Sequence, residues 1–475
     1  MSCLEPQPHT SSSGSDVLPY DLVLAGGTLA TPGGAFVGDL AIRGSSIAAL
    51  GRRLDAPCRH RIDARGLWVL PGLIDPHVHL GLPVSSGLIS EGITRATAAG
   101  LRGGVTTVFD FTLHQPGRSL ADSLSARRQE YAARSHCDFG LHVNVTHLQS
   151  DFGSKLSTEL HAAASRGART IKIFTTYSER EMRVERRQLD ALLRAARECR
   201  ILTLVHAEDD TIIRQATNTL QSSHRYTMNN FARARPAAAE AAAIETVAAA
   251  AHHADCPIYF VHVSSQAGRT ALVAARQRNR QRIIFETCPQ YLYLDDSVYE
   301  QADAVQFAVT PPLRSPADVA ALRAALLRGE IDLIGTDHCA FSYAAKQQAA
   351  ETIADLPQGL AGIETRLPLV YDLLRSANQD DMLRLVDLLS AEPARVLGLY
   401  PRKGALQLDS DADVVLFDPK ATKTIRAATL ATSTGFSPYE GLTVSGDVRC
   451  VLLRGQVVVA DGAVIGAPLG IDLQA

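Results

Sequence analysis

The sequence predicts an α/β protein, namely a (β/α)8 TIM barrel with a discontinuous β-sandwich domain formed by the N- and C-terminal segments. Three observations predict this fold. Between Pro71 and about Leu399, short apolar strands alternate with helical stretches rich in Ala, Leu and Arg. Eight such β/α units fit in this length. Both ends of the chain instead carry short β-like runs separated by turns.

These changes in the pattern of strands and helices divide the chain into domains. We expect 1–16, which is polar and rich in serine, to be a disordered tail without the apolar core of a secretory signal. Residues 17–70 form the first part of the β-sandwich, 71–399 the barrel and 400–475 the second part of the sandwich.

Taken in order, the first end offers strand-like runs at 21–31, 35–51 and 60–70, with glycines at the turns. The eight barrel strands are expected at Leu73–His77, Val105–Phe111, Phe139–Val145, Thr170–Phe174, Leu202–His206, Ile258–His262, Ile283–Glu286 and Leu333–Asp337. Intervening helices are expected at Thr94–Arg102, Leu120–Ala133, Arg187–Glu198, Ala237–His252, Arg269–Arg278 and Ala317–Leu327. Strands return at 412–418, 448–453 and 456–459.

Composition narrows the range of partners. The 475 residues are 46% hydrophobic and carry a formal charge of -3, so the chain has no basic surface for nucleic acid or an anionic membrane. No window is apolar and long enough to span a bilayer. The eight cysteines are far apart, which favours free thiols and a reducing, cytoplasmic setting. A small neutral substrate fits this composition best.

The stretch LPGLIDPHVHL ends a buried strand in His77 and His79. Residues two apart in a strand point to the same side, so the two imidazoles could chelate zinc or a similar divalent ion. Alternatively, both are ordinary hydrogen-bonded core histidines. The residues at the ends of the other barrel strands distinguish a metal site from ordinary core histidines.

Polar side chains recur where barrel strands end. His206, His262 and Asp337 each close a strand, and in a barrel these ends share one mouth. Four histidines and an aspartate at one mouth indicate a metal-dependent active site. Lys172, between Ile171 and Ile173, would bury its ammonium unless it titrates to the neutral amine, which can add carbon dioxide to form a carbamate. The alternative is a lysine that pairs with an acid or extends to solvent.

From about Tyr20 onwards the sequence resembles the amidohydrolase superfamily, and within it the hydantoinase/dihydropyrimidinase family of cyclic amidohydrolases. The resemblance is carried by the motifs PGLIDPHVHL, GGVTTVFDF, TIKIFTTY, VHAED, ETCPQYL, TPPLR, GTDHCAF and GLAGIETRLP.

The resemblance implies two metal ions, here expected to be zinc. His77, His79 and Asp337 would bind the more buried ion, and His206 and His262 the second. Lys172, as N6-carboxylysine, would bridge the two ions. It also implies a homotetramer or homodimer.

Three further positions follow from the resemblance. Tyr177 matches the tyrosine that stabilises the oxyanion, and Thr310 falls where the family contacts the cyclic imide through main-chain atoms. Gln358 stands where relatives commonly have Asn, a departure that bears on ring preference more than on chemistry.

The implied reaction opens a cyclic amide (imide) ring, that of a hydantoin or a dihydropyrimidine, to an N-carbamoyl amino acid. Asp337 would accept the proton of a metal-activated water and return it to the leaving nitrogen.

Three alternatives remain at this point. Allantoinases and dihydroorotases share the metal ligands, but a dihydroorotase-like site places an Arg soon after the two histidines, where this chain has Gly81 and Leu82. Allantoinase is harder to exclude. The third is a non-catalytic dihydropyrimidinase-like scaffold, which retention of all six expected ligands counts against.

Overall fold

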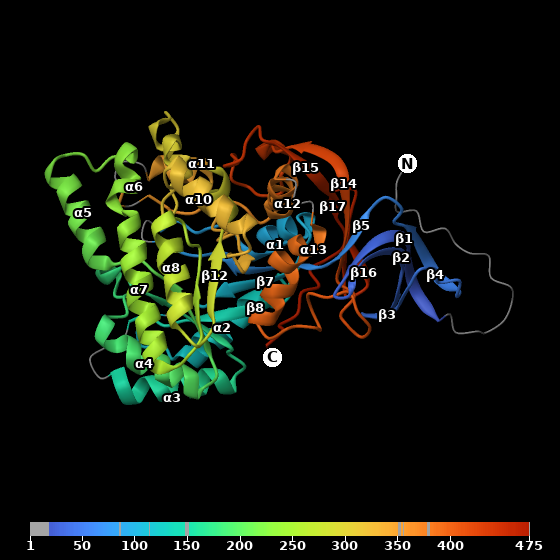
Figure 1. Ribbon diagram of the computed structural model, residues 1–475, viewed down its shortest axis with the longest axis horizontal. Coiled ribbons are helices and arrows are strands. Elements are labelled where there is room, and N and C mark those ends of the chain that lie inside the picture. Colours follow the sequence, from blue (N-terminus) through green and yellow to red (C-terminus); the bar gives the residue numbers. More distant parts are fainter. Residues whose placement is uncertain are drawn as a thin grey trace.

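The computed structural model describes residues 19–84, 87–113, 115–147, 152–349, 353–354, 356–377 and 381–474. The expected tail at 1–16 lies outside these residues. Two separate sheets organise the chain, an eight-stranded parallel sheet and a nine-stranded mixed sheet. Figure 1 shows strands of the first sheet among the helices and the second sheet to their right.

The parallel sheet forms a nearly closed barrel in which consecutive strands are neighbours. Its strands are β6 (Leu73–Val78), β7 (Val105–Phe111), β8 (Asp138–Asn144), β9 (Thr170–Phe174), β10 (Leu202–His206), β11 (Ile258–Phe260), β12 (Ile283–Thr287) and β13 (Leu333–Ile334). A bridge between Val78 and His338 brings the first strand to the end of the last. The predicted (β/α)8 architecture is therefore confirmed.

Two barrel strands are shorter than predicted. The expected strands 258–262 and 333–337 end at Phe260 and Ile334. His262 and Asp337 have φ values of 39° and 52°, a left-handed conformation that takes the chain out of the strand direction. Both side chains therefore project from turns at the barrel mouth.

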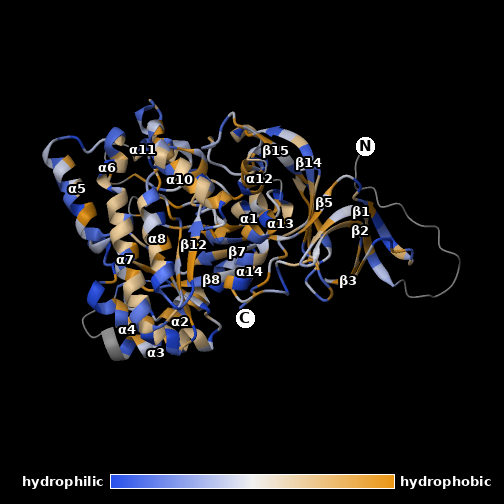
Figure 2. Ribbon diagram, viewed as in Figure 1, coloured by the Kyte–Doolittle hydropathy of each residue, from blue (hydrophilic) through white to orange (hydrophobic). Residues whose placement is uncertain are grey.

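Helices cover the outside of the barrel. The longer ones are α1 (Ile93–Arg102), α2 (Leu120–Tyr131), α3 (Phe152–Ser165), α4 (Arg186–Glu198), α5 (Asp210–Ser222), α7 (Ala237–Ala254), α8 (Gln266–Arg278), α10 (Pro316–Leu327) and α12 (Arg366–Ser376). The short helices are α6 (Phe231–Ala234), α9 (Pro289–Tyr293), α11 (Tyr343–Gln348), α13 (Met382–Val386) and α14 (Glu392–Val396). In Figure 2, β12 is coloured hydrophobic whereas α4 and α5 carry hydrophilic stretches, as expected for strands enclosed by amphipathic helices.

Local sequence explains where many helices begin. Ser315 accepts a hydrogen bond from the Asp318 amide, and Pro316 occupies the first turn of α10. Ser265 caps α8 in the same way, through the Gly268 amide.

The mixed sheet joins the two ends of the chain. Its strands are β1 (Tyr20–Thr31), β2 (Gly34–Arg43), β3 (Ser46–Gly51), β4 (Cys58–Asp63), β5 (Trp68–Pro71), β14 (Val414–Thr424), β15 (Thr443–Leu453), β16 (Gln456–Ala460) and β17 (Ala463–Val464). β5 pairs with β14, with Val69 opposite Leu416, which connects the N-terminal strands to the C-terminal ones. Leu24, Leu40 and Leu452 from both ends are buried in one core. The expected discontinuous β domain is thus present.

A buried charge cluster ties this domain to the barrel. Lys403 is 2% exposed and donates to Asp138 at 2.6 Å and to Asp413 at 2.7 Å. Asp138 begins β8, so the cluster lies at the end of the barrel opposite the mouth. Arg454 also pairs with Asp138.

Two expectations from the sequence concern membrane-spanning segments and disulfides. Within them, no helix combines the length and apolar character needed to cross a bilayer. The seven cysteines that they include are free thiols.

Candidate active site

His77, His79 and Asp337 lie together at the barrel mouth. Asp337 Oδ1 is 3.3 Å from His77 Nε2 and 3.2 Å from His79 Nε2, and the two nitrogens are 3.3 Å apart. A tetrahedral ion with bonds of about 2.1 Å holds its ligand atoms about 3.4 Å apart. The triangle therefore has the dimensions of three ligands around one metal ion.

The protonation of this group suits metal binding. Burial lowers the pKa of His77 well below its ordinary value, so the ring is neutral, which is the ligand form. Burial opposes the charge on Asp337, but the two imidazoles outweigh it and lower the pKa of this carboxyl. The group thus offers the neutral Nε2 of His77 and a carboxylate as ligands, with the His79 ring beside them.

Glu286 orients His77 from behind. His77 Nδ1 lies 2.8 Å from Glu286 Oε1, and donation from this nitrogen leaves the Nε2 lone pair facing Asp337. Glu286 also accepts from the Tyr259 hydroxyl and from the His262 amide. Burial raises the pKa of Glu286 to about 7, whereas these donors favour its carboxylate.

His206 and His262 form a second group beside the first. Their ring centroids are 4.6 Å apart, and the His262 ring lies 5.4 Å from that of His77. Both side chains are buried. The structure therefore gathers the four predicted histidines, which lie in or just after β6, at the end of β10 and just after β11.

Lys172 lies inside the barrel near these rings. It is 1% exposed, and its Nζ is 5.1 Å from the Phe111 ring centroid and 5.6 Å from that of Phe174. Burial lowers the pKa of this amine to about 8, against the attraction of Asp337 and Glu286. A minor neutral fraction of this amine, larger than for an ordinary lysine, is therefore available for reaction with carbon dioxide near neutral pH.

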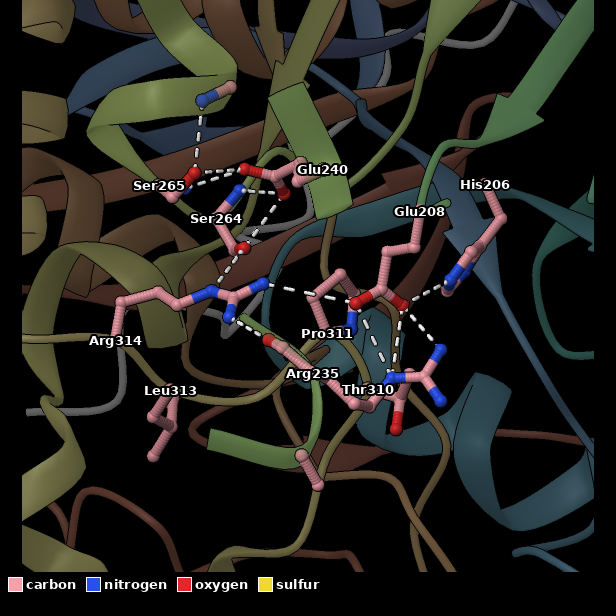
Figure 3. Close-up of polar contacts among 12 residues, drawn as sticks. His206, Glu208, Arg235, Glu240, Ser264, Ser265, Thr310, Pro311, Leu313 and Arg314 are labelled. Atoms are coloured by element: carbon pink, nitrogen blue, oxygen red, sulfur yellow. Dashed lines mark hydrogen bonds and ion pairs between the residues drawn. The ribbon is translucent and has the colours of Figure 1, made fainter. Parts of the chain in front are cut away.

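Figure 3 shows a buried network that extends from His206. Glu208 accepts from His206 Nε2 at 2.7 Å and from Arg235 Nη2 at 2.5 Å. This pairing leaves His206 Nδ1 as the nitrogen available for a metal. Burial disfavours the charge on Glu208, but Arg235 and His206 outweigh it and lower the pKa of this carboxyl to about 2. The guanidinium of Arg314 lies 3.9 Å from Glu208 and continues the network to Ser264.

Tyr177 stands at the edge of the histidine cluster. Its ring centroid is 5.3 Å from that of His206, and the Arg235 guanidinium lies 5.1 Å from the ring centre. The residue is left-handed, with a φ of 66°, which turns the chain back after β9. Burial raises the pKa of Tyr177 to about 12, so the hydroxyl keeps its proton and can donate it in a hydrogen bond.

Thr310 and Gln358 meet on another side of the mouth. The Thr310 hydroxyl donates to the Gln358 side-chain carbonyl, although the two residues are 48 positions apart. The Gly359 amide donates to the Ala308 carbonyl at 2.9 Å and joins the same two segments.

Sequence reasoning missed three residues of the site. Glu208 lies in VHAED, two residues after the strand-end His206, and an acid beside a strand-end histidine is the signal that could have identified it. Glu286 lies in ETCPQYL, where no neighbouring histidine marks it. Arg235 gave no comparable signal, because its partner Glu208 is 27 residues away and the intervening chain forms α5 and α6.

The protein has a nearly closed parallel barrel with a His-His-Asp group at the C-terminal ends of its strands. These two features place it in the class of barrel proteins that carry a metal site at this end. Comparison with known proteins specifies the family. The model of the Amidohydrolase family matches residues 68–458.

Full-length relatives agree with this match. The D-hydantoinase of Ralstonia pickettii is 31% identical over 451 residues, which cover 94% of this chain and 97% of that protein. The D-phenylhydantoinase of Escherichia coli O9:H4 is 31% identical over 94% of this chain and 96% of its own. The crystal structure of dihydropyrimidinase from Brevibacillus agri matches with a TM-score of 0.90 and 30% identity, over 95% of this chain and 98% of that one. The chain belongs to the amidohydrolase family and, within it, to the branch of hydantoinases and dihydropyrimidinases.

Proposed function

We propose that this protein is an enzyme that hydrolyses the cyclic amide bond of hydantoins or dihydropyrimidines and releases N-carbamoyl amino acids. The observation that carries the proposal is the 3.2–3.3 Å triangle of His77, His79 and Asp337. It lies at the barrel mouth of a chain that aligns with D-hydantoinases over nearly its whole length.

The donor set fits two divalent ions. In this proposal His77, His79 and Asp337 hold the more buried ion, and His206 Nδ1 and His262 hold the second. Lys172, carboxylated on Nζ, would supply a ligand oxygen to each ion. Such ions lower the pKa of a water and polarise a carbonyl, which makes amide hydrolysis feasible near neutral pH.

The chain's own groups then move protons and orient the ring. Asp337 accepts a proton during attack on the carbonyl carbon and returns it to the leaving nitrogen. The Tyr177 hydroxyl donates a hydrogen bond to the developing oxyanion, a contact worth about 3 kcal/mol in comparable sites. Thr310 and Gln358 contact the remaining imide atoms of the ring.

Several finer features belong to the same proposal. The ions are zinc, the working form is a homotetramer or homodimer, and the enzyme acts in the cytoplasm on a small cyclic amide. The barrel domain comprises 71–399, between the two parts of the β domain at 17–70 and 400–475.

The test is hydrolysis of dihydrouracil, 5-phenylhydantoin, allantoin and dihydroorotate by zinc-loaded protein. Lys172→Ala is assayed beside it, with Lys423→Ala, at a half-buried site in β14, as its control. We expect ring opening of the first two compounds, abolished only in Lys172→Ala. Turnover confined to allantoin or dihydroorotate would move the protein to a sister activity. Absence of both bound metal and turnover would favour a non-catalytic scaffold.

A further inference from the structure

A second buried lysine lies near the mouth, outside the proposed metal centre. Lys346 in α11 is fully buried, and its Nζ donates to three main-chain carbonyls. The distances are 2.9 Å to Gln306, 2.9 Å to Ala308 and 2.7 Å to Gly359. All three hydrogen bonds are made by Nζ, so they satisfy the polar end of this buried side chain.

The geometry matches the charged form of this side chain. An ammonium has three N–H bonds, one for each carbonyl, whereas a neutral amine has only two. Burial lowers the pKa of Lys346 to about 7, and the three acceptors work against that decrease. Within the described parts of the chain no carboxylate forms an ion pair with it. The positive charge is therefore held by carbonyl dipoles and by the Phe436 ring, 5.8 Å from Nζ.

The three carbonyls belong to the two segments that present the ring-binding residues. Gln306 and Ala308 precede Thr310, and Gly359 follows Gln358. Ala308 also accepts the Gly359 amide at 2.9 Å, so the ammonium lies where the two segments cross. Loss of the ammonium would leave three buried carbonyls with one fewer donor and would loosen the crossing.

This crossing is also connected to the strand end that carries Asp337. The Cys339 amide donates to the Leu360 carbonyl at 3.0 Å, and His338 forms a parallel bridge with Leu360. The segment after Gln358 is thus joined to the metal-binding turn on one side and to the Thr310 segment on the other. Lys346 contributes to the second junction only.

We propose that Lys346 is a positioning residue that sets the distance between the Thr310 and Gln358 segments and thereby the affinity for the cyclic substrate. This inference rests on the proposed function of the site. Misplacement of ring-contacting groups by a fraction of an ångström weakens substrate binding, while the metal centre and Tyr177 keep their geometry.

The test compares Lys346→Met with Lys403→Met in the full-length, zinc-loaded protein. Lys403 is a matched control because it is an equally buried lysine with carboxylate partners at the opposite end of the barrel. For dihydrouracil or 5-phenylhydantoin we expect KM to rise about tenfold or more in Lys346→Met, with kcat within about threefold of wild type. Zinc content should stay unchanged, and KM in Lys403→Met should equal that of wild type.

Hydrogen–deuterium exchange supplies a readout that does not need turnover. Amides in 304–310 and 356–361 should exchange faster in Lys346→Met than in Lys403→Met, in which any increase should be spread over the whole protein. If wild-type protein opens no ring, the proposed function fails and exchange alone decides the role of Lys346. Unchanged KM and unchanged exchange would overturn the inference. So would loss of folding in both Lys346→Met and the milder Lys346→Gln, because the lysine would then serve the fold rather than the two segments.

Discussion

Replacement of Glu208 by Gln tests whether the buried network of Figure 3 supports the second metal ion. The carboxylate accepts from both His206 and Arg235, at 2.7 Å and 2.5 Å. A glutamine of the same shape keeps one acceptor oxygen and turns an N–H2 group towards one of these donors. One charge-assisted hydrogen bond is lost, which is worth about 1.5–3 kcal/mol.

Loss of this hydrogen bond should weaken binding of the second metal ion. Binding of the ion held by His77, His79 and Asp337 should not change. Outer carboxylates that orient a ligating histidine typically contribute about 10–100-fold to metal affinity. At about 1.4 kcal/mol per tenfold, that range agrees with the loss of one such hydrogen bond. We expect Glu208→Gln to retain one zinc ion per chain after dialysis and wild-type protein to retain two.

The assay is metal content by mass spectrometry, followed by competition with a chelator for the weaker ion. Glu330→Gln is the control, since Glu330 also pairs with arginines, Arg269 and Arg328, but at a partly exposed site on the outside of the barrel. Two ions held with wild-type affinity in Glu208→Gln would refute the argument that this carboxylate orients His206.

Three further outcomes are expected. Tyr177→Phe should lower kcat about 10²–10³-fold with zinc content unchanged, measured by steady-state hydrolysis of dihydrouracil, and an effect on KM alone would contradict an oxyanion role. Glu208 has a pKa of about 2 in the folded protein, below its ordinary 4.5, so its pairing stabilises the fold above about pH 4.5 and this contribution disappears as the pH falls towards 2. The melting temperature of metal-free wild-type protein should therefore fall more steeply between about pH 5 and 3 than that of Glu208→Gln, and parallel curves would be evidence against this pairing. Lys403→Met removes the cation between Asp138 and Asp413 and should cost about 3–5 kcal/mol in urea unfolding, whereas an unchanged midpoint would show that the cluster adds no stability.

Much of the fold could be predicted from the sequence because its signals are local. A parallel strand buried on both faces appears as a short apolar run, and β7, β9 and β10 have the bounds expected from their runs. Strand ends could be misplaced where the chain turns sharply, as at His262 and Asp337. No local sequence pattern indicates their left-handed conformations.

The candidate ligands were also visible in the sequence, since barrel topology brings every strand end to one mouth. Residue type and position at a strand end sufficed to select His77, His206 and Asp337. Their assignment as metal ligands, and the roles of Tyr177, Thr310 and Gln358, remain predictions. The structure adds that these side chains converge at hydrogen-bonding and ring-contact distances.

The sequence by itself determined the barrel, the division of the β domain between the two ends and the set of polar side chains at the mouth. Only the tertiary structure showed that Glu286 orients His77 from 209 positions away, and that Lys346 lies under the crossing of the Thr310 and Gln358 segments. The physical reason is that strand and helix patterns arise from neighbouring residues, whereas the partner of a buried charge is set by which distant segments close around it.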